Sequence, residues 1–543
     1  MNTNEPVLRI SGLSIAFRSG GELVTAVNDV SIDVAAGETV AIVGESGSGK
    51  STTAAAINRL LPENGRITAG SILFEGREIT TLAENELVRL RGAGIGLVPQ
   101  DPMSNLNPLV RVGDQIGEAL EVHGYASGAT VHERVVELLE MVGIPNPEQR
   151  SRQYPHDFSG GMRQRALIAM GLACRPRLLI ADEPTSALDV TVQRRILDQL
   201  DKLTGEMGTA VFLITHDLAL AAERADRIVV MFRGRIVDEG SSAEVLSSPQ
   251  HDYTKQLLAA APSLASRRAL PPLRSAAIDA RPLVEVQDLR KVFALRSPKA
   301  GEPDSFTAVD GVSFTIPRGK TVSIVGESGS GKSTTANLVL GLEDITSGTI
   351  AFDGVDLTTL KRRELFAFRR RVQPVFQNPY ASLDPRYTVE QSIAEPLAVH
   401  RIGTAATRRA RVAELLEQVA LPGAMAARLP HELSGGQRQR VAIARALALE
   451  PELVVLDEAV SALDVLVQAQ ILELLAELQG RLGLSYLFIS HDLAVVRMIS
   501  DEVHVMQRGR IVESGTPEQI FDAPQNEYTQ ELLAAIPGAR LAS

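Results

Sequence analysis

The chain has 543 residues, a length that predicts several domains or a duplicated pair rather than one core. Its net charge of −11 argues against a non-specific grip on DNA or RNA, which basic surfaces provide. The one cysteine, Cys174, excludes disulfides within the chain and any metal or iron–sulfur centre held by several cysteines. The sequence shows neither a signal-peptide pattern at its start nor an apolar run long enough to cross a bilayer, so we expect a cytoplasmic protein.

The chain repeats one plan twice. Each half opens with a β-patterned segment, residues 7–17 and residues 283–293, and the same motifs then follow in the same order. Residues 262–282 are rich in Pro, Ser and Arg and have weak periodicity, which is typical of a linker. We therefore predict one domain over residues 1–261 and a second over residues 283–543.

The sequence GESGSGKST occurs at residues 44–52 and again at residues 326–334. Each copy fits the phosphate-loop pattern G-x-x-x-x-G-K-[ST], with an apolar strand before it and a helix starting at the lysine. The glycines let successive N–H groups face phosphate oxygens, the lysine reaches the β- and γ-phosphates, and the serine ligates Mg²⁺. The sequence thus predicts ATP sites formed by Gly44, Ser46, Gly47, Ser48, Gly49, Lys50, Ser51, Thr52, Gly326, Ser328, Gly329, Ser330, Gly331, Lys332, Ser333 and Thr334.

In each half, one buried-strand pattern ends in an Asp-Glu pair and the next ends in His-Asp. The aspartate can hold Mg²⁺, the glutamate can polarise the attacking water, and the histidine can donate to the γ-phosphate. The acidic pair could instead cap the next helix, and a lone histidine is more often structural. The same placement downstream of both phosphate loops favours catalytic roles for Asp182, Glu183, His216, Asp457, Glu458 and His491.

A Ser-Gly-Gly sequence opens a long alanine-rich helix in each half. A serine cap and free N–H groups at a helix start make an anion site, so each half has two phosphate-binding devices but one set of acidic residues. Head-to-tail pairing of the halves resolves this, with the helix at 434–436 covering the nucleotide on Lys50 and the helix at 159–161 covering that on Lys332. The residues concerned are Ser159, Gly160, Gly161, Ser434, Gly435, Gly436 and Gln437.

Over nearly its whole length the chain resembles a pair of ABC-type ATPase domains. The phosphate loops, Gln100 and Gln377, the Ser-Gly-Gly helices, the Asp-Glu pairs, two Ser-Ala-Leu-Asp segments and the histidines follow in the family's order. The resemblance implies two α/β P-loop domains, each with a RecA-like core, an N-terminal antiparallel β part and a helical subdomain. It also implies that Gln100 and Gln377 contact the metal and that adenine stacks on Phe17 and Phe293, although either ring could be simple strand core.

Finer motifs are similar to the ATPases of oligopeptide, dipeptide and nickel importers. They include QDPMSNLNP after Gln100, QNPYASLDP after Gln377, and a Tyr-Thr-x-x-Leu-Leu core in each tail. This resemblance implies an ATP-hydrolysing motor for peptide import at the cytoplasmic face of the membrane, with two transmembrane permease subunits and an extracytoplasmic binding protein. The alternative is a twin ATPase acting on ribosomes or nucleic acid, but the sequence has no long charged linker and no cysteine-rich zinc module. A drug-exporter motor would usually be fused to membrane helices of its own.

Overall fold

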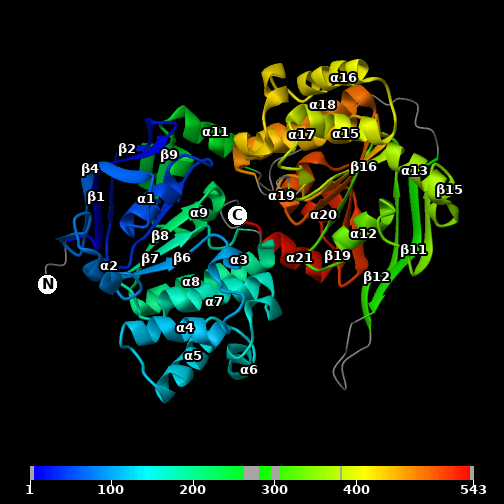
Figure 1. Cartoon of the computed structure of the whole chain (residues 1–543). Coiled ribbons are helices and arrows are strands. Elements are labelled where there is room, and N and C mark those ends of the chain that lie inside the picture. The colour runs from blue at the N-terminus through cyan, green and yellow to red at the C-terminus, as the bar shows by residue number, and fades with distance from the viewer. Residues whose placement is uncertain are drawn as a thin grey trace.

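The computed structural model describes residues 5–186, 188–261, 281–294, 305–378, 382–461 and 463–537. Most of the predicted linker, residues 262–280, lies outside the described residues. Both repeats have the same architecture: an antiparallel sheet, a mostly parallel sheet and helices that cover them (Figure 1).

In repeat one, the antiparallel sheet has the order β2-β1-β4-β5 and the second sheet the order β10-β9-β3-β8-β7-β6. The inner strands of the second sheet are parallel, buried and mostly apolar, because both faces of that sheet are covered. The strands are β1 (Leu8–Ser19), β2 (Glu22–Val34), β3 (Thr39–Val43), β4 (Gly65–Phe74), β5 (Arg77–Glu78), β6 (Ile95–Val98), β7 (Leu178–Asp182), β8 (Ala210–Thr215), β9 (Arg227–Phe232) and β10 (Arg235–Ser241).

The helices of repeat one include a separate helical group packed around α4, α5 and α7. Val135, Leu138, Leu139 and Val142 recur at helical spacing, and all four are buried in that group. The helices are α1 (Lys50–Ile57), α2 (Glu84–Leu90), α3 (Pro102–Asn105), α4 (Val112–Val122), α5 (Ala129–Met141), α6 (Pro147–Ser151), α7 (Gly160–Leu172), α8 (Val190–Met207), α9 (Leu218–Arg224), α10 (Ser242–Ser247) and α11 (Asp252–Ala260), with a 3₁₀ turn at Pro155–Asp157.

Repeat two has the same two sheets, with orders β12-β11-β14-β15 and β16-β17-β18-β13-β19-β20. Its strands are β11 (Val284–Ala294), β12 (Ser305–Ile316), β13 (Thr321–Val325), β14 (Ser347–Phe352), β15 (Val355–Asp356), β16 (Val372–Val375), β17 (Leu453–Asp457), β18 (Ser485–Ser490), β19 (Glu502–Gln507) and β20 (Arg510–Gly515). Its helices are α12 (Lys332–Val339), α13 (Arg362–Arg371), α15 (Val389–Val399), α16 (Ala405–Gln418), α17 (Gly435–Leu447), α18 (Val465–Leu482), α19 (Leu493–Ile499), α20 (Pro517–Asp522) and α21 (Glu527–Ala534), with 3₁₀ turns at Leu357–Thr359, Gly423–Ala427 and Pro430–Glu432.

The strand order brings the sequence motifs of each repeat to one edge of its parallel sheet. In repeat one, β3 leads into the phosphate loop, β7 ends at Asp182, and β8 is followed by His216. These three strands are neighbours and run in the same direction, so their carboxyl ends meet at one crevice. Gln100 follows β6, the next strand in the sheet, and repeat two has the same arrangement.

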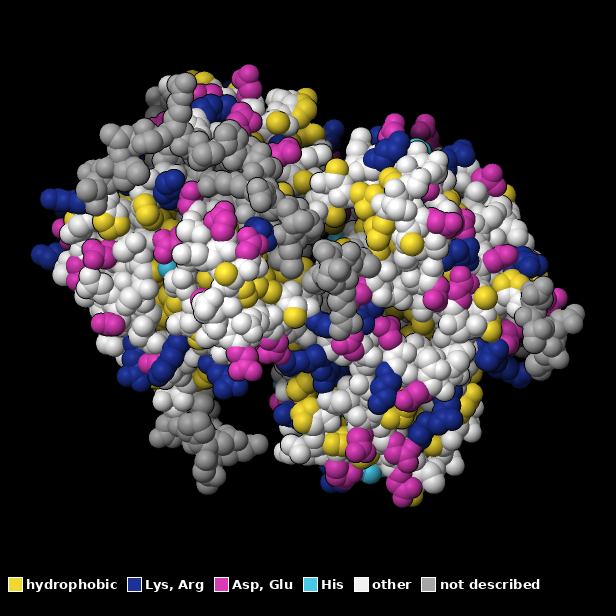
Figure 2. All heavy atoms as spheres, turned by 180° about the vertical axis from the view of Figure 1, so that it is seen from behind, with side chains coloured by type: hydrophobic (Ala, Val, Ile, Leu, Met, Phe, Trp, Pro, Cys, Tyr) yellow, Lys and Arg dark blue, Asp and Glu magenta, His cyan; other side chains and the backbone are white. Residues whose placement is uncertain are grey.

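The two repeats contact each other through the helices that follow the Ser-Ala-Leu-Asp segments. Tail helix α11 packs against α18, and tail helix α21 packs against α8 (Figure 1). Lys and Arg side chains are interspersed with Asp and Glu over the face seen in Figure 2, rather than gathered into one basic surface. Within the described ranges, no helix combines the length and the apolar character needed to cross a membrane.

Candidate nucleotide sites

Each phosphate loop is held closed by its own lysine. Lys50 Nζ donates to the carbonyl oxygens of Gly44 (2.7 Å) and Glu45 (2.9 Å), and Lys332 does the same in repeat two. Both helices begin at the lysine, as predicted, after a glycine in the left-handed region: Gly49 has a φ of 103°. Burial lowers the pKa of both lysines, and the nearby carboxylates oppose that shift. An anion bound in the loop would therefore pair with a cation that is already largely removed from water.

The first glycine of each loop is required because the backbone passes very close to a neighbouring strand. A Cβ at Gly44 would lie 2.2 Å from the carbonyl oxygen of Met231, and one at Gly326 would lie 2.1 Å from that of Met506. Real Cβ atoms do not approach backbone this closely, so any side chain would displace the loop from the sheet edge.

The serine after each lysine meets the aspartate at the end of the neighbouring strand. Ser51 Oγ donates to Asp182 Oδ1 at 3.1 Å, and Ser333 Oγ donates to Asp457 Oδ1 at the same distance. Burial raises the pKa of both aspartates. Within the described ranges, no cluster of three His, Cys, Asp or Glu side chains could hold a metal. One hydroxyl and one carboxylate per site nevertheless fit Mg²⁺, which uses few carboxylates together with substrate phosphates and water.

Glu183 is held by two of the predicted site residues. It accepts a hydrogen bond from Gln100 Nε2 at 2.7 Å, and His216 Nδ1 lies 3.2 Å from its other oxygen. Burial opposes ionisation of Glu183, but the hydrogen bond and charge of His216 lower its pKa below the usual value. Burial likewise favours a neutral His216, yet Glu183 raises the pKa of that imidazole. The carboxylate therefore stays ionised and able to accept a proton.

Repeat two reproduces this arrangement. Glu458 accepts from Gln377 Nε2 at 2.6 Å and faces His491 Nδ1 at 3.4 Å. Glu183 and Glu458 both have left-handed backbone, with φ values of 45° and 48°. Such strain is uncommon in non-glycine residues and collects at functional sites.

A cavity of about 310 Å³ opens over the phosphate loop of repeat two. Its lining brings together residues that were predicted to form one site, among them Lys332, Ser333, Gln377, Glu458 and His491. Its lining residues are Asp189, Phe306, Ala308, Ser328, Gly329, Gly331, Lys332, Ser333, Thr334, Gln377, Glu458 and His491.

Asp189 is the residue of repeat one that lines this cavity. Its Oδ2 accepts from the backbone N–H of Ser328 at 3.2 Å, and the hydroxyl of Thr191 donates to the carboxylate of Glu327. The repeats thus meet head to tail at this phosphate loop through the Ser-Ala-Leu-Asp region. The Ser-Gly-Gly serines cap their own helices, with Ser159 Oγ accepting from Met162 N and Ser434 Oγ from Gln437 N. A Ser-Gly-Gly contact with the opposite nucleotide stays a prediction.

The two rings predicted to stack on adenine have different surroundings. Phe17 packs against the core beside Gly65, where a Cβ would lie 2.7 Å from the ring. Phe293 pairs across the sheet with Phe306, which lines the cavity, and Lys291 Nζ lies 4.8 Å from the Phe293 ring centre. Stacking on Phe17 and Phe293 also stays a prediction.

Comparison with known proteins identifies the chain. The family model described as "ABC transporter" matches residues 27–186 and 309–461. The chain belongs to the ABC transporter family. The model described as "Oligopeptide/dipeptide transporter, C-terminal region" matches this ABC ATPase at residues 237–302 and 512–541.

Two relatives resemble this ABC ATPase over nearly the whole of both chains. The "Glutathione import ATP-binding protein GsiA" of Salmonella choleraesuis is 46% identical over 559 residues, covering 98% of this chain and 90% of its own. The "Peptidoglycan transport ATP-binding protein YejF" of Agrobacterium fabrum is 48% identical over 535 residues, covering 98% and 96%. The predicted tandem ABC architecture and ATPase activity are confirmed: the chain is an ATP-hydrolysing transport subunit.

Several residues at the sites were not singled out from the sequence. Phe306 is an exposed aromatic on the strand facing Phe293, and that cross-strand register could have been a signal. Glu327 occupies a variable position of the phosphate-loop pattern, so its contact with Thr191 of the other repeat had no sequence signal.

Proposed function

We propose that this ABC ATPase powers the import of peptides through two separate permease subunits at the cytoplasmic face of the membrane. The observation that carries the proposal is the oligopeptide/dipeptide transporter region that follows each ATPase domain. The relatives are named for glutathione import and peptidoglycan transport, so glutathione and peptides derived from peptidoglycan are candidate cargo beside di- and oligopeptides. An extracytoplasmic binding protein would select among them.

In each repeat, the residues around the phosphate loop would bind ATP and activate water for its hydrolysis. Lys50 would hold the phosphates, and Ser51, Asp182 and Gln100 would hold Mg²⁺, which supplies positive charge to the phosphates when bound. Glu183 would accept the proton of the attacking water, since its carboxylate is ionised at neutral pH. Lys332, Ser333, Asp457, Gln377 and Glu458 would do the same in repeat two.

His216 and His491 would stabilise charge that develops at the γ-phosphate. Each imidazole lies beside the proposed base, and its pKa is raised by that carboxylate, so it can donate a charged hydrogen bond. Closure of the repeats around two nucleotides would assemble both sites, and hydrolysis would release them. The contact between Asp189 and the phosphate loop of repeat two supports this head-to-tail pairing.

The test is reconstitution of the chain with its two permease subunits in lipid vesicles. Binding proteins loaded with dipeptides, oligopeptides, glutathione or peptidoglycan-derived peptides are added in turn, and ATP hydrolysis and uptake are measured together. We expect one class of loaded binding protein to stimulate hydrolysis and uptake in parallel. Sedimentation of the chain with ribosomes, without stimulation by any peptide, would contradict the proposal.

A further inference from the structure

A buried tyrosine near the start of each tail helix reaches the phosphate loop of its own repeat. The hydroxyl of Tyr253 accepts from the backbone N–H of Glu45 at 2.7 Å, and that of Tyr528 accepts from the N–H of Glu327 at 3.0 Å. The two tyrosines are 4% and 6% exposed. The same contact occurs in both repeats, although their sequences differ at many other positions.

The residue whose N–H each tyrosine accepts is also a partner of the phosphate-loop lysine. The carbonyl oxygen of Glu45 accepts from Lys50 Nζ at 2.9 Å, and the carbonyl of Glu327 accepts from Lys332 Nζ at 2.7 Å. The tyrosine therefore fixes the N–H of a residue whose carbonyl oxygen accepts from the lysine. A shift of this residue would move the lysine that binds the phosphates.

Each tyrosine is itself held firmly, because the start of its helix is fixed to the sheet. The N–H of Tyr253 donates to His251 Nδ1, and the N–H groups of Gln250 and His251 donate to Asp238 on β10. In repeat two, Asn526 caps the helix. The N–H groups of Gln525 and Asn526 donate to Glu513 on β20. Burial, with smaller contributions from nearby carboxylates, raises the pKa of both hydroxyls, so they stay protonated.

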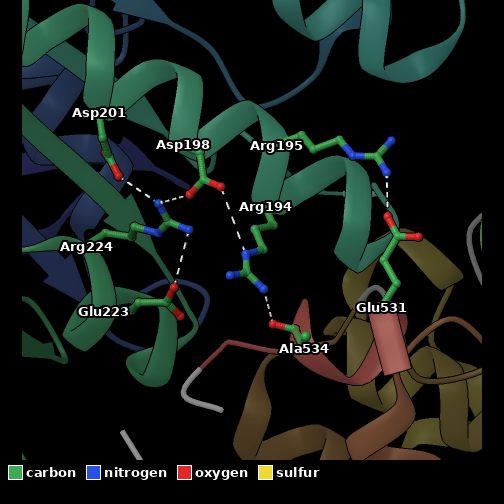
Figure 3. A network of polar contacts seen from close by, with 8 residues as sticks. All are labelled: Arg194, Arg195, Asp198, Asp201, Glu223, Arg224, Glu531 and Ala534. Carbon is green, nitrogen blue, oxygen red and sulfur yellow. Dashed lines mark hydrogen bonds and ion pairs between the residues drawn. The ribbon is translucent and has the colours of Figure 1, made fainter. Parts of the chain in front are cut away.

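The tail helix also contacts the opposite repeat. Figure 3 shows α21 against α8: Arg195 forms an ion pair with Glu531 at 2.7 Å, and Arg194 donates to the carbonyl of Ala534. Val190 at the start of α8 packs against the apolar cluster that contains Tyr528. In the other half, Leu466 of α18 packs against the cluster that contains Tyr253. Both tail helices thus lie between a phosphate loop and the helix that follows the opposite Ser-Ala-Leu-Asp segment.

We propose that Tyr253 and Tyr528 are positioning residues for ATP hydrolysis, and that each tail helix links the position of its phosphate loop to the opposite repeat. This assigns a role to the C-terminal region that follows each ATPase domain, a role independent of the cargo. Tyrosine is suited to it because its ring anchors in the apolar cluster while its hydroxyl reaches the loop.

The test compares Tyr253→Phe with Tyr528→Phe, singly and together, in the full chain. Phenylalanine keeps the ring and its packing but leaves the N–H of Glu45 or Glu327 without its acceptor. We expect the KM for ATP of the double variant to rise roughly five- to tenfold, as for one lost hydrogen bond per site, with kcat changed less than about twofold. The dissociation constant of a fluorescent ATP analogue should rise by the same factor.

The matched control is Tyr486→Phe. This tyrosine is 1% exposed and its hydroxyl donates to the carbonyl of Leu475 at 2.8 Å, at the end of the parallel sheet away from the phosphate loop. The control should lower the melting temperature and leave the KM unchanged. Equal KM in wild type and the double variant, or an equal rise in the control, would overturn the positioning role.

The link to the opposite repeat is tested by exchanging the charges of one ion pair. Glu531→Arg places like charges together and should raise the KM for ATP, and adding Arg195→Glu should restore it. The pair is about half exposed, so we expect a change of about two- to threefold. A Glu531→Arg variant with wild-type KM, or an exchange that fails to restore it, would overturn the link while leaving the tyrosine result intact.

Discussion

Replacing both proposed bases, Glu183→Gln with Glu458→Gln, should stop ATP turnover while leaving ATP bound. Glutamine has the size of glutamate, and its carbonyl oxygen can still accept from Gln100 or Gln377, which lie 2.7 and 2.6 Å away in the native chain. The substitution therefore removes the charge and the proton acceptor but keeps the contact. A positioned general base is worth about 10²- to 10⁴-fold in rate, or about 3 to 5 kcal/mol of activation free energy.

The assay measures steady-state phosphate release and, separately, the binding of a fluorescent ATP analogue. We expect kcat of the double variant to fall at least about 100-fold, while the dissociation constant for ATP changes less than about threefold. The exposed Glu206→Gln, at the far end of α8, serves as the control and should hydrolyse ATP normally. Wild-type turnover in the double variant would refute the assignment of the bases, as would a loss of ATP binding in step with activity.

The same variant gives a second readout that does not depend on turnover. The pKa of His216 is raised by the hydrogen bond and charge of Glu183, against the effect of burial. In Glu183→Gln that stabilisation of the imidazolium disappears, so the pKa of His216 should fall. Titration of the histidine ring signals by NMR, in the nucleotide-free protein, measures this shift. An unchanged titration would show that the carboxylate does not control the imidazole.

Three further predictions concern other parts of the chain. Gly326→Ala should weaken ATP binding at that site by about 100-fold, because the new Cβ would meet Met506 O at 2.1 Å and displace the loop by about 1 Å. Asp189→Asn keeps the helix cap but gives the Ser328 N–H a donor in place of an acceptor, and should raise the KM for ATP about three- to tenfold. Burial lowers the pKa of His504 to about 4. The free energy of unfolding, measured in urea, should therefore fall by about 3 kcal/mol as pH falls from about 6.5 to 4. The substitution His504→Gln should remove that decrease.

Each of these variants has a control that separates the expected effect from a general loss of stability. Gly319→Ala also has a positive φ, of 70°, but nothing lies near its Cβ, so it should cost stability without affecting ATP binding. For Asp189→Asn the control is Glu206→Gln on the same helix. For His504→Gln it is His431→Gln, the same substitution at an exposed position of the same repeat. Wild-type ATP affinity at the repeat-two site of Gly326→Ala, an unchanged KM in Asp189→Asn, or an unchanged pH slope in His504→Gln would contradict the respective argument.

Most of the fold could be predicted because its signals are local. Strand–loop–helix order and an apolar face at helical spacing need no knowledge of distant contacts, and both helix starts at Lys50 and Lys332 were found as expected. The convergence of Asp182, Glu183 and His216 also followed, because parallel strands place their carboxyl ends together.

Contacts between the repeats could not be predicted in the same way. The contact of each Ser-Gly-Gly helix with the opposite nucleotide stays a prediction, and no sequence motif indicated that Asp189 of repeat one lines the cavity of repeat two. Which element reaches across depends on how two folded domains meet, and neither motif encodes that geometry locally. The tyrosines of the tail helices were visible as a repeated motif, yet their contact with Glu45 and Glu327 spans about two hundred residues of chain.

Carrying both nucleotide pockets on one polypeptide has an evolutionary consequence. In a homodimer every substitution changes both pockets at once, whereas here each can drift alone. The two repeats already differ beside the aromatic ring that is predicted to stack on adenine. The residue that pairs with this ring across the sheet is Val24 opposite Phe17 and Phe306 opposite Phe293. Selection can therefore tune one pocket for tight retention and the other for rapid exchange, without a second gene.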